Sequence, residues 1–263
     1  MNLLEQQMAE ILRIGIANGS YVGVKAEFEA EGTRMGELLR LVDVARRAGA
    51  KLAVKIGGCE AIRDLLESKQ IGVDYIIAPM VESSYAIMKY DSAITKTYSQ
   101  VEKEQTKFLF NLETKQTFDN FDAILNSFKL NSNIDGVVFG RNDFAGSLDL
   151  GSKGIESEKV TNFVVDSADK CKKVNLEFVV GGGVSSSSLD NLKRISQTHL
   201  TRFETRKVLF HAKSLVSKSI KQDLLMAVKF ELLWLKNKQE HYFTISKEDE
   251  SRFKILNDRW DLI

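Results

Sequence analysis

The chain has 263 residues, of which 43% are hydrophobic and 28% are charged, and its formal net charge is +1. This is the composition of a globular protein, and the near-zero charge gives no basis for binding nucleic acid or a membrane surface. The two cysteines, Cys59 and Cys171, form no CxxC pair, the polar first residues do not resemble a signal peptide, and no window holds about 18 apolar residues. We therefore expect a cytoplasmic protein without disulfides.

Segments with helical and strand-like periodicity alternate along the chain. Apolar residues at helical spacing predict helices over residues 2–17, 34–48, 59–69, 83–96, 115–129, 157–173, 185–197 and 211–238. Short apolar or alternating runs predict strands over residues 21–29, 51–56, 73–78, 107–113, 136–140, 176–180 and 201–208. Residues 142–156 contain several glycines and predict a long loop or a short helix. A last amphipathic piece is expected near residues 247–257.

Strands that alternate with helices indicate a parallel sheet covered by helices, as in a doubly wound sheet or a (β/α)8 barrel. One face of the predicted strands carries polar and charged residues, namely Lys25, Glu27, Glu29, Lys55, Asn111, Glu113, Arg202, Glu204 and Arg206. In an open sheet, helices would bury these charges, whereas in a barrel they line the lumen that opens into the active site. We therefore predict a TIM-type (β/α)8 barrel. Because only seven strands are predicted, the barrel is either incomplete or completed by a strand in the N- or C-terminal region.

We assign residues 1–210 to the barrel domain, including the N-terminal helix, and residues 211–263 to a C-terminal helical extension. The helix over residues 211–238 is longer than an outer barrel helix needs, and Trp234 with its apolar neighbours indicates a packing face. We expect this extension to mediate homo-oligomerisation.

Two of the predicted strands end in a carboxylate. Glu113 closes the run that begins at Phe108, Asp143 follows the run that begins at Gly136, and roughly 20 helix-like residues lie between them. Strands joined in parallel through a helix end at the same edge of the sheet, so the two carboxylates are expected to converge there. Two converging carboxylates suggest a site for a hard divalent cation, most simply Mg²⁺.

Four runs in order resemble the aldolase/citrate lyase family over residues 20–208. They are Ala53-Val54-Lys55, Ile77-Ala78-Pro79-Met80-Val81-Glu82-Ser83, Asn111-Leu112-Glu113-Thr114 and Val137-Val138-Phe139-Gly140-Arg141-Asn142-Asp143. The resemblance implies a phosphoenolpyruvate/pyruvate-type TIM barrel. It also implies that Glu113 and Asp143 bind Mg²⁺ or Mn²⁺, which chelates a 2-oxo acid or an enolate derived from a CoA thioester.

The sequence departs from this family at two places. Lys55 stands where the family has an arginine, and lysine supplies the charge without the bidentate fork. The segment Lys25-Ala26-Glu27-Phe28-Glu29-Ala30-Glu31-Gly32 lacks the histidine of the aldolase branch, and the three histidines of the chain lie elsewhere. Either Glu27 or Glu29 replaces that base, or the base is absent.

From these patterns we predict a metal-dependent carbon–carbon lyase that acts through an enolate of a 2-oxo acid, phosphoenolpyruvate or an acyl-CoA-like compound. The predicted catalytic residues are Glu27, Glu29 and Lys55, and the residues predicted to bind the anionic substrate are Lys25, Lys55, Asn111, Arg141 and Arg206. Three alternatives stay open. The lumen charges could form a structural salt-bridge network, Asp143 could only cap a helix, and the barrel could bind an anionic metabolite or serve a complex without catalysis.

Overall fold

The structure is a computed structural model that describes residues 1–128 and 132–260. Its strands are β1 (Tyr21–Glu27), β2 (Lys51–Lys55), β3 (Tyr75–Ala78), β4 (Lys107–Leu112), β5 (Ile134–Gly140), β6 (Glu177–Gly181), β7 (Arg202–Glu204) and β8 (Val208–His211). Its α-helices are α1 (Leu3–Ala17), α2 (Met35–Ala48), α3 (Ile62–Ile71), α4 (Ser84–Thr97), α5 (Gln100–Lys103), α6 (Lys115–Asp119), α7 (Phe121–Asn126), α8 (Arg141–Ser147), α9 (Glu158–Lys173), α10 (Leu189–Thr198) and α11 (Ile220–Trp260). Short 3₁₀ turns lie at Ser152–Gly154, Ser186–Ser188 and Ala212–Val216.

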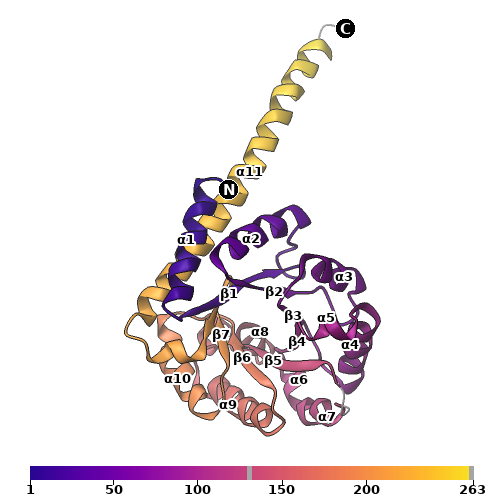
Figure 1. Ribbon diagram of the computed structural model, residues 1–263, viewed down its shortest axis with the longest axis vertical. Helices are drawn as coiled ribbons and strands as arrows, with labels where there is room; N and C mark the ends of the chain where they lie inside the picture. The colour runs from indigo at the N-terminus through magenta and orange to yellow at the C-terminus, as the bar shows by residue number, and fades with distance from the viewer. Residues whose placement is uncertain (129–131, 261–263) are drawn as a thin grey trace.

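The strands form a closed barrel in the order β1 to β8, with helices around it (Figure 1). Neighbours from β1 to β7 pair in parallel, whereas β8 pairs antiparallel with both β7 and β1. The predicted barrel is thus confirmed, and the missing strand is β8. Because β8 runs backwards, the chain leaves the barrel at the end opposite to the carboxyl ends of the parallel strands.

The single strand predicted over residues 201–208 is wrong. The chain turns through Thr205, Arg206 and Lys207, and the Thr205 backbone N–H donates to the Val208 carbonyl at 3.0 Å. The charged residues Arg202, Glu204 and Arg206 alternate through the turn, so periodicity alone does not reveal it. The turn places Arg206 at the carboxyl end of the barrel.

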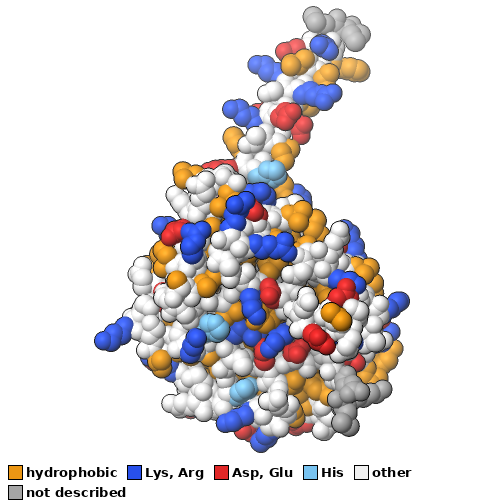
Figure 2. Space-filling view, in the orientation of Figure 1, with side chains coloured by type: hydrophobic (Ala, Val, Ile, Leu, Met, Phe, Trp, Pro, Cys, Tyr) orange, Lys and Arg blue, Asp and Glu red, His pale blue; other side chains and the backbone are white. Residues whose placement is uncertain are grey.

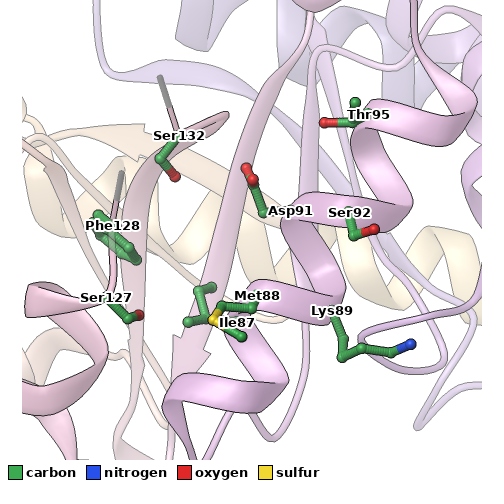
Figure 3. Close-up of a pocket in the computed structure, with 9 residues that line it drawn as sticks. All are labelled: Ile87, Met88, Lys89, Asp91, Ser92, Thr95, Ser127, Phe128 and Ser132. Carbon is green, nitrogen blue, oxygen red and sulfur yellow. The ribbon is translucent and has the colours of Figure 1, made fainter. Parts of the chain in front are cut away.

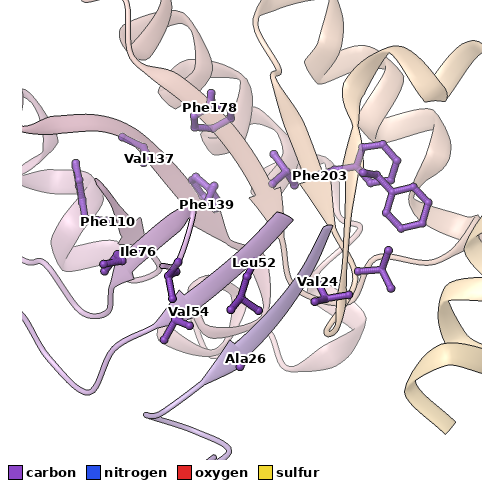
Figure 4. Packing of buried hydrophobic residues seen from close by; sticks show 14 of the residues in the cluster. Val24, Ala26, Leu52, Val54, Ile76, Phe110, Val137, Phe139, Phe178 and Phe203 are labelled. Atoms are coloured by element: carbon purple, nitrogen blue, oxygen red, sulfur yellow. The ribbon is translucent and has the colours of Figure 1, made fainter. Parts of the chain in front are cut away.

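Apolar side chains pack on both faces of the barrel wall, one set under the helices and one set inside the lumen. The outer faces of the strands pack under the helices, as Phe110, Phe139 and Phe178 do (Figure 4). A smaller apolar cluster fills the lower lumen and includes Val22, Ala53, Tyr75, Ile77, Leu109, Val138, Val179 and Leu209. Arg202 also reaches this cluster, with its guanidinium over the Tyr75 ring and an ion pair to Glu177, so the lower lumen is not wholly apolar. Val22 lies in this cluster whereas Val24 packs under the helices, because the pairing of β1 with β8 shifts register between Tyr21 and Gly23.

One predicted helix is split and one predicted short helix is present. The helix predicted over residues 115–129 is split into α6 and α7 around Asn120, and residue 129 lies outside the described residues. Residues 142–156 contain most of the short helix α8 and a 3₁₀ turn, in agreement with one of the two expectations.

Helix α11 is one continuous helix of 41 residues that begins at Ile220, not at residue 211. Its buried residues, among them Leu224, Ala227, Phe230 and Trp234, recur every three or four positions, and the helix packs beside α1. From Phe243 to Trp260 every residue is exposed, and this part projects away from the barrel (Figure 1). The break predicted after residue 238 does not occur. The division of the chain at residue 210 stays a prediction.

Within residues 1–128 and 132–260, no helix combines the length and the apolar character that crossing a membrane requires.

Candidate active site

A cavity of about 300 Å³ opens at the carboxyl ends of the parallel strands. The charged and amide side chains that line it are Lys25, Glu27, Glu29, Lys55, Asn111, Glu113, Asn142, Asp143, Glu204 and Arg206. Glu113 and Asp143, predicted to converge, are both in this set. The barrel therefore brings together every predicted site residue except Arg141.

Glu113 is held in place by three donors. Its Oε1 accepts from the Met80 backbone N–H at 2.9 Å, and its Oε2 accepts from Asn111 Nδ2 at 2.6 Å and from Lys55 Nζ at 3.2 Å. Only 1% of the Glu113 side chain is exposed. A carboxylate has about four lone-pair positions, so one position on Oε1 stays open.

The backbone around Glu113 is shaped for this arrangement. Met80 has a φ of 50°, a left-handed conformation that is uncommon for a residue with a side chain. On the other side, a Cβ atom at Gly140 would lie 2.9 Å from the Cβ of Glu113. Only glycine lets the end of β5 approach this closely.

The two lumen lysines are each clamped between two carboxylates. Lys25 Nζ lies 2.5 Å from Glu204 Oε1 and 3.1 Å from Glu27 Oε1. Lys55 Nζ lies 3.2 Å from Glu113 and 3.1 Å from Glu29. Burial alone would lower the pKa of both lysines, but their carboxylate partners outweigh it and raise the pKa of each above its ordinary value. Both lysines are therefore ammonium ions at neutral pH. The network predicted as an alternative does exist, and it surrounds the cavity.

Glu27 is a weak base in this setting. Burial would raise its pKa, but Lys25, Lys55 and Lys207 together lower it below the ordinary value of 4.5. Glu29 differs in its exposure, because 28% of its side chain is open to solvent while it contacts Lys55. Of the two candidate bases, Glu29 is the one that can exchange protons with water.

Asp143 lies in the first turn of α8 and is exposed, and it lines the cavity. The N-cap residue of α8 is Gly140. The alternative in which Asp143 only caps this helix is therefore wrong.

The donor set fits a hard divalent cation. Asn111 Oδ1 is buried and has no hydrogen-bond partner, although its amide nitrogen is engaged by Glu113. The cavity carries five carboxylates against three cations, a formal charge of −2. Among the described residues no group of three acidic, histidine or cysteine side chains forms a metal site on its own. Glu113, Asp143 and Asn111 Oδ1 would therefore share the ion with oxygens of water or substrate, as Mg²⁺ prefers.

Arg141, predicted to bind substrate, does not line the cavity. It is 1% exposed, and its guanidinium donates to the carbonyls of Gly181 and Gly182 at 3.3 and 2.9 Å and pairs with Glu156 at 3.0 Å. Burial lowers the pKa of Arg141, and Glu156 only partly opposes that effect. The guanidinium ties the start of α8 to the loop after β6. The substrate-binding role is therefore not supported.

Arg206 lies at the rim of the cavity. Its side chain is 58% exposed, and its Nε donates to Glu31 Oε1 at 3.1 Å. Lys207 of the same turn also pairs with Glu31. The partner of Arg206 is thus in the segment after β1.

Glu204 lines the cavity, although the sequence predicts it only as a lumen charge and not as a site residue. Its place on the lumen face was predictable from the alternation along β7. Its role as the partner of Lys25 depends on how β7 and β1 face each other, which the sequence pattern does not fix.

A second cavity, of about 440 Å³, lies beside α4 (Figure 3). It is lined by Ile87, Met88, Lys89, Asp91, Ser92, Thr95, Ser127, Phe128 and Ser132. None of the predicted site residues is among these, and its charged groups are a single lysine and a single aspartate. The candidate active site is therefore the cavity at the carboxyl ends of the parallel strands, where the predicted site residues gather.

Replacing Lys25 with methionine is expected to destabilise the fold by about 3–5 kcal/mol at pH 7, because it leaves Glu27 and Glu204 buried without their cation. The pKa of the Glu27 carboxylate is lowered from 4.5 in the folded protein. Its contribution to the stability of the fold is therefore present above pH 4.5 and is lost as the pH falls through the lowered pKa. The contribution of Lys25 is present below 10.5 and is lost as pH rises through its raised pKa.

Urea denaturation of both proteins at pH 4 and pH 7 tests this. The difference in the free energy of unfolding between wild type and variant should be smaller at pH 4, where the carboxylates left without Lys25 can take up protons. If this difference in free energy is the same at both pH values, the destabilisation does not have an electrostatic origin.

Comparison with known proteins identifies a family whose model matches the middle of the chain. A model of the family described as HpcH/HpaI aldolase/citrate lyase matches residues 32–180. That span contains Lys55, Asn111, Glu113 and Asp143 but neither β1 nor β7. None of the curated proteins matches the chain.

Several solved structures share the fold. An HpcH/HpaI aldolase from Desulfitobacterium hafniense DCB-2 is 17% identical with a TM-score of 0.60, covering 78% of this chain and 84% of that one. An HpcH/HpaI aldolase/citrate lyase family protein from Burkholderia cenocepacia J2315 is 10% identical with a TM-score of 0.64, covering 94% and 92%. The citrate synthase SbnG is 16% identical with a TM-score of 0.61, covering 84% and 89%. These likenesses show the fold, and the family model spans more than half of the chain. The protein therefore belongs to the HpcH/HpaI aldolase/citrate lyase family.

Proposed function

We propose that the protein is a carbon–carbon lyase or aldolase that depends on a divalent metal ion and acts through the enolate of a 2-oxo acid. Family membership supports the lyase or aldolase type of activity. The observation that carries the metal dependence is the convergence of Glu113, Asp143 and the unpartnered Asn111 Oδ1 on a cavity with excess negative charge.

Mg²⁺ or Mn²⁺ would be held by Glu113 and Asp143, with Asn111 Oδ1 as a further oxygen. When bound, such an ion stabilises the negative charge that an enolate develops. The residues of the chain then have separate tasks. Lys55 places an ammonium beside Glu113 and adds positive charge near the reacting carbonyl. Lys25 is held deeper by Glu204 and Glu27 and raises the positive potential of the lumen without a free donor of its own.

Glu29 is the proposed acid/base. It reaches Lys55 at 3.1 Å, so it stands beside the same ammonium that faces Glu113, and its partial exposure lets it exchange the proton with solvent. In the cleavage direction it would accept the proton of the hydroxyl group next to the breaking bond. The same carboxyl group would then give that proton to the enolate carbon. In the condensation direction it would take a methyl proton of pyruvate and pass it to the aldehyde oxygen.

The direct test is exchange of the pyruvate methyl protons in D₂O, followed by ¹H NMR. We expect exchange that requires Mg²⁺ or Mn²⁺ and stops when the ion is removed with EDTA. If no exchange occurs although pyruvate binds in a metal-dependent way, the alternative of a non-catalytic barrel that binds an anionic metabolite holds.

Replacing Glu29 with glutamine should lower the exchange rate about 100-fold, because general acid–base catalysis contributes roughly 10²–10⁴-fold. The matched control is Glu27→Gln, which removes a carboxylate that is already held by Lys25 and shielded from solvent. It should reduce the rate less than Glu29→Gln does. The reverse order would assign the proton transfer to Glu27.

The remaining part of the proposal concerns oligomerisation through α11. Four residues of this helix form an exposed apolar stripe at three- and four-residue spacing, namely Leu225, Val228, Leu232 and Leu235. At the same spacing the stripe is interrupted at Gln239, Ser246 and Asp249. Exposed apolar residues resume at Phe253, Leu256 and Trp260 in the projecting part, where orange side chains lie among red and blue ones (Figure 2). A repeat of this period on a long helix suits pairing with the same helix of a second copy.

Light scattering on the full chain at micromolar concentration is expected to give a multiple of 29.6 kDa. The double variant Leu232→Glu with Leu235→Glu should shift the mass towards the monomer. A monomeric wild-type protein would contradict the oligomer.

A further inference from the structure

The proposed acid/base, Glu29, lies in the loop between β1 and α2. Two backbone hydrogen bonds hold the start and the end of this loop, from the Phe28 N–H to the Lys55 carbonyl at 2.8 Å and from the Thr33 N–H to the Glu27 carbonyl at 3.1 Å. Among the described residues, the stretch between these two bonds makes no backbone hydrogen bond to a strand, and it is exposed or half-buried. Side chains must therefore set the position of this part of the loop.

Glu31 ties the middle of the loop to the turn between β7 and β8. Its carboxylate pairs with Lys207 and accepts from Arg206 Nε at 3.1 Å, and both cations belong to that turn. Only 2% of the Lys207 side chain and 11% of the Glu31 side chain are exposed, so water competes little for this pair. An ion pair in such surroundings fixes the geometry of a loop in a way that an exposed pair does not.

Lys207 contacts β1 and α11 as well as Glu31. Its Nζ donates to the Lys25 carbonyl at 3.5 Å, and its own carbonyl accepts from the Lys25 backbone N–H at 2.9 Å. Its ammonium also lies 5.9 Å from the centre of the Trp234 ring in α11. The ammonium is therefore a fixed point against which the loop is set.

Lys207 does not line the cavity, so it does not touch a substrate bound there. Its influence would pass along the chain, because Glu31 and Glu29 are two residues apart and lie within about 7 Å of each other. The proposed metal ligands Glu113 and Asp143 follow β4 and β5 and do not depend on this contact. The ion pair thus bears on the proton-transfer side of the site and not on its metal-binding side.

We propose that Lys207 is a positioning residue, which through Glu31 holds the loop that carries Glu29 at the distance that proton transfer requires. This inference rests on the proposed function, since it concerns the residue to which that function gives the proton transfer. A general base must lie within hydrogen-bond reach of the proton it takes, so a small shift of the loop is enough to slow the reaction. On a continuous strand over residues 201–208, Lys207 would face the helices, and only the turn brings it to this loop.

The test is the exchange of pyruvate methyl protons in D₂O by the full chain with Mg²⁺. Lys207→Met is expected to lower kcat per folded molecule about 10- to 100-fold, because a misplacement of about 1 Å can slow a reaction about 100-fold. KM for pyruvate should change less than about 2-fold, because the metal-binding side is untouched. A variant that keeps kcat, or that raises KM instead, would overturn the inference.

Glu31→Ala tests the same ion pair from the loop side and leaves the buried lysine in place. It should lower kcat in the same way, and a folded Glu31→Ala with the kcat of wild type would also overturn the inference. The control is Lys69→Met, which breaks the ion pair of Lys69 with Glu102 at 2.9 Å, away from the cavity. This control should leave kcat unchanged.

The variant Glu29→Gln shows whether the effect passes through Glu29. Adding Lys207→Met to Glu29→Gln should lower kcat by no more than about 2-fold further, because the group that Lys207 positions is already gone. If the two losses multiply, Lys207 acts by another route and the inference fails.

The same samples separate this inference from the proposed function. If wild type exchanges pyruvate protons and Glu29→Gln slows the exchange, but Lys207→Met does not, only the inference fails. If wild type shows no exchange, the proposed function fails with it.

Discussion

Replacing Asp143 with asparagine is expected to slow metal-dependent exchange of pyruvate about 10²–10³-fold while the barrel stays folded. We expect a decrease in rate of this size because the variant loses one group that stabilises the charge developing in the active site. Asp143 is exposed and lies in the first turn of α8, so its replacement should change the free energy of unfolding by less than about 0.5 kcal/mol. Measuring the exchange rate and the urea denaturation curve of the same sample separates a loss of activity from a loss of stability.

The matched control is Asp149→Asn. Asp149 is also exposed, lies just beyond α8, and has a φ of 56°, which asparagine tolerates. It does not line the cavity. Its replacement should leave the exchange rate unchanged, and an equal loss in both variants would remove Asp143 from the proposed site.

Replacing Arg141 with methionine is expected to destabilise the protein by about 3 kcal/mol or more. The buried guanidinium donates to the carbonyls of Gly181 and Gly182 and pairs with Glu156. Methionine removes this donor from both carbonyls and leaves Glu156 without its cation, although Ser188 and Asn191 still donate to Glu156. The midpoint of urea denaturation measures this loss. Arg141→Lys is the conservative control, because lysine keeps the charge but not the planar fork, and it should recover only part of the stability.

Arg141 also distinguishes a structural role from a substrate-binding one. If Arg141→Met keeps its stability and instead raises KM for pyruvate, then the role predicted from the sequence was right. If Arg141→Met loses stability and the remaining folded enzyme keeps its KM, the role of the arginine is structural: it holds α8 to the loop after β6.

The parts of the site that could be predicted from sequence depend on strand periodicity. Lys55, Asn111 and Glu113 lie on the lumen face because side chains alternate along a strand, and they lie at its upper end because they come last in the run. Glu113 and Asp143 converge because parallel strands end at one edge. These statements need no knowledge of neighbouring side chains.

The parts that failed depend on local backbone geometry. Arg141 comes directly after β5, where the chain turns into α8 at Gly140, so alternation no longer fixes its direction. A register shift in β1 puts Val22 and Val24 on opposite faces, which simple alternation does not predict, and the turn at Arg206 interrupts a segment that the sequence presents as one strand. In α11, helix-forming residues continue through the polar segment after residue 238, so polarity alone did not mark an end.

The choice of partners within the lumen was also beyond prediction. The sequence placed four lysine and arginine side chains near five carboxylates without saying which would pair. The structure selects Lys25 with Glu204 and Glu27, and Lys55 with Glu113 and Glu29. These pairings follow from the order of the strands around the closed barrel.

The most direct test of the account is the binding of oxalate, a mimic of the pyruvate enolate, measured by titration calorimetry with and without Mg²⁺. We predict that oxalate binds only when Mg²⁺ is present and that Asp143→Ala abolishes this binding. Oxalate binding that does not need Mg²⁺, or that survives Asp143→Ala, would contradict the metal-dependent enolate site formed by Glu113 and Asp143.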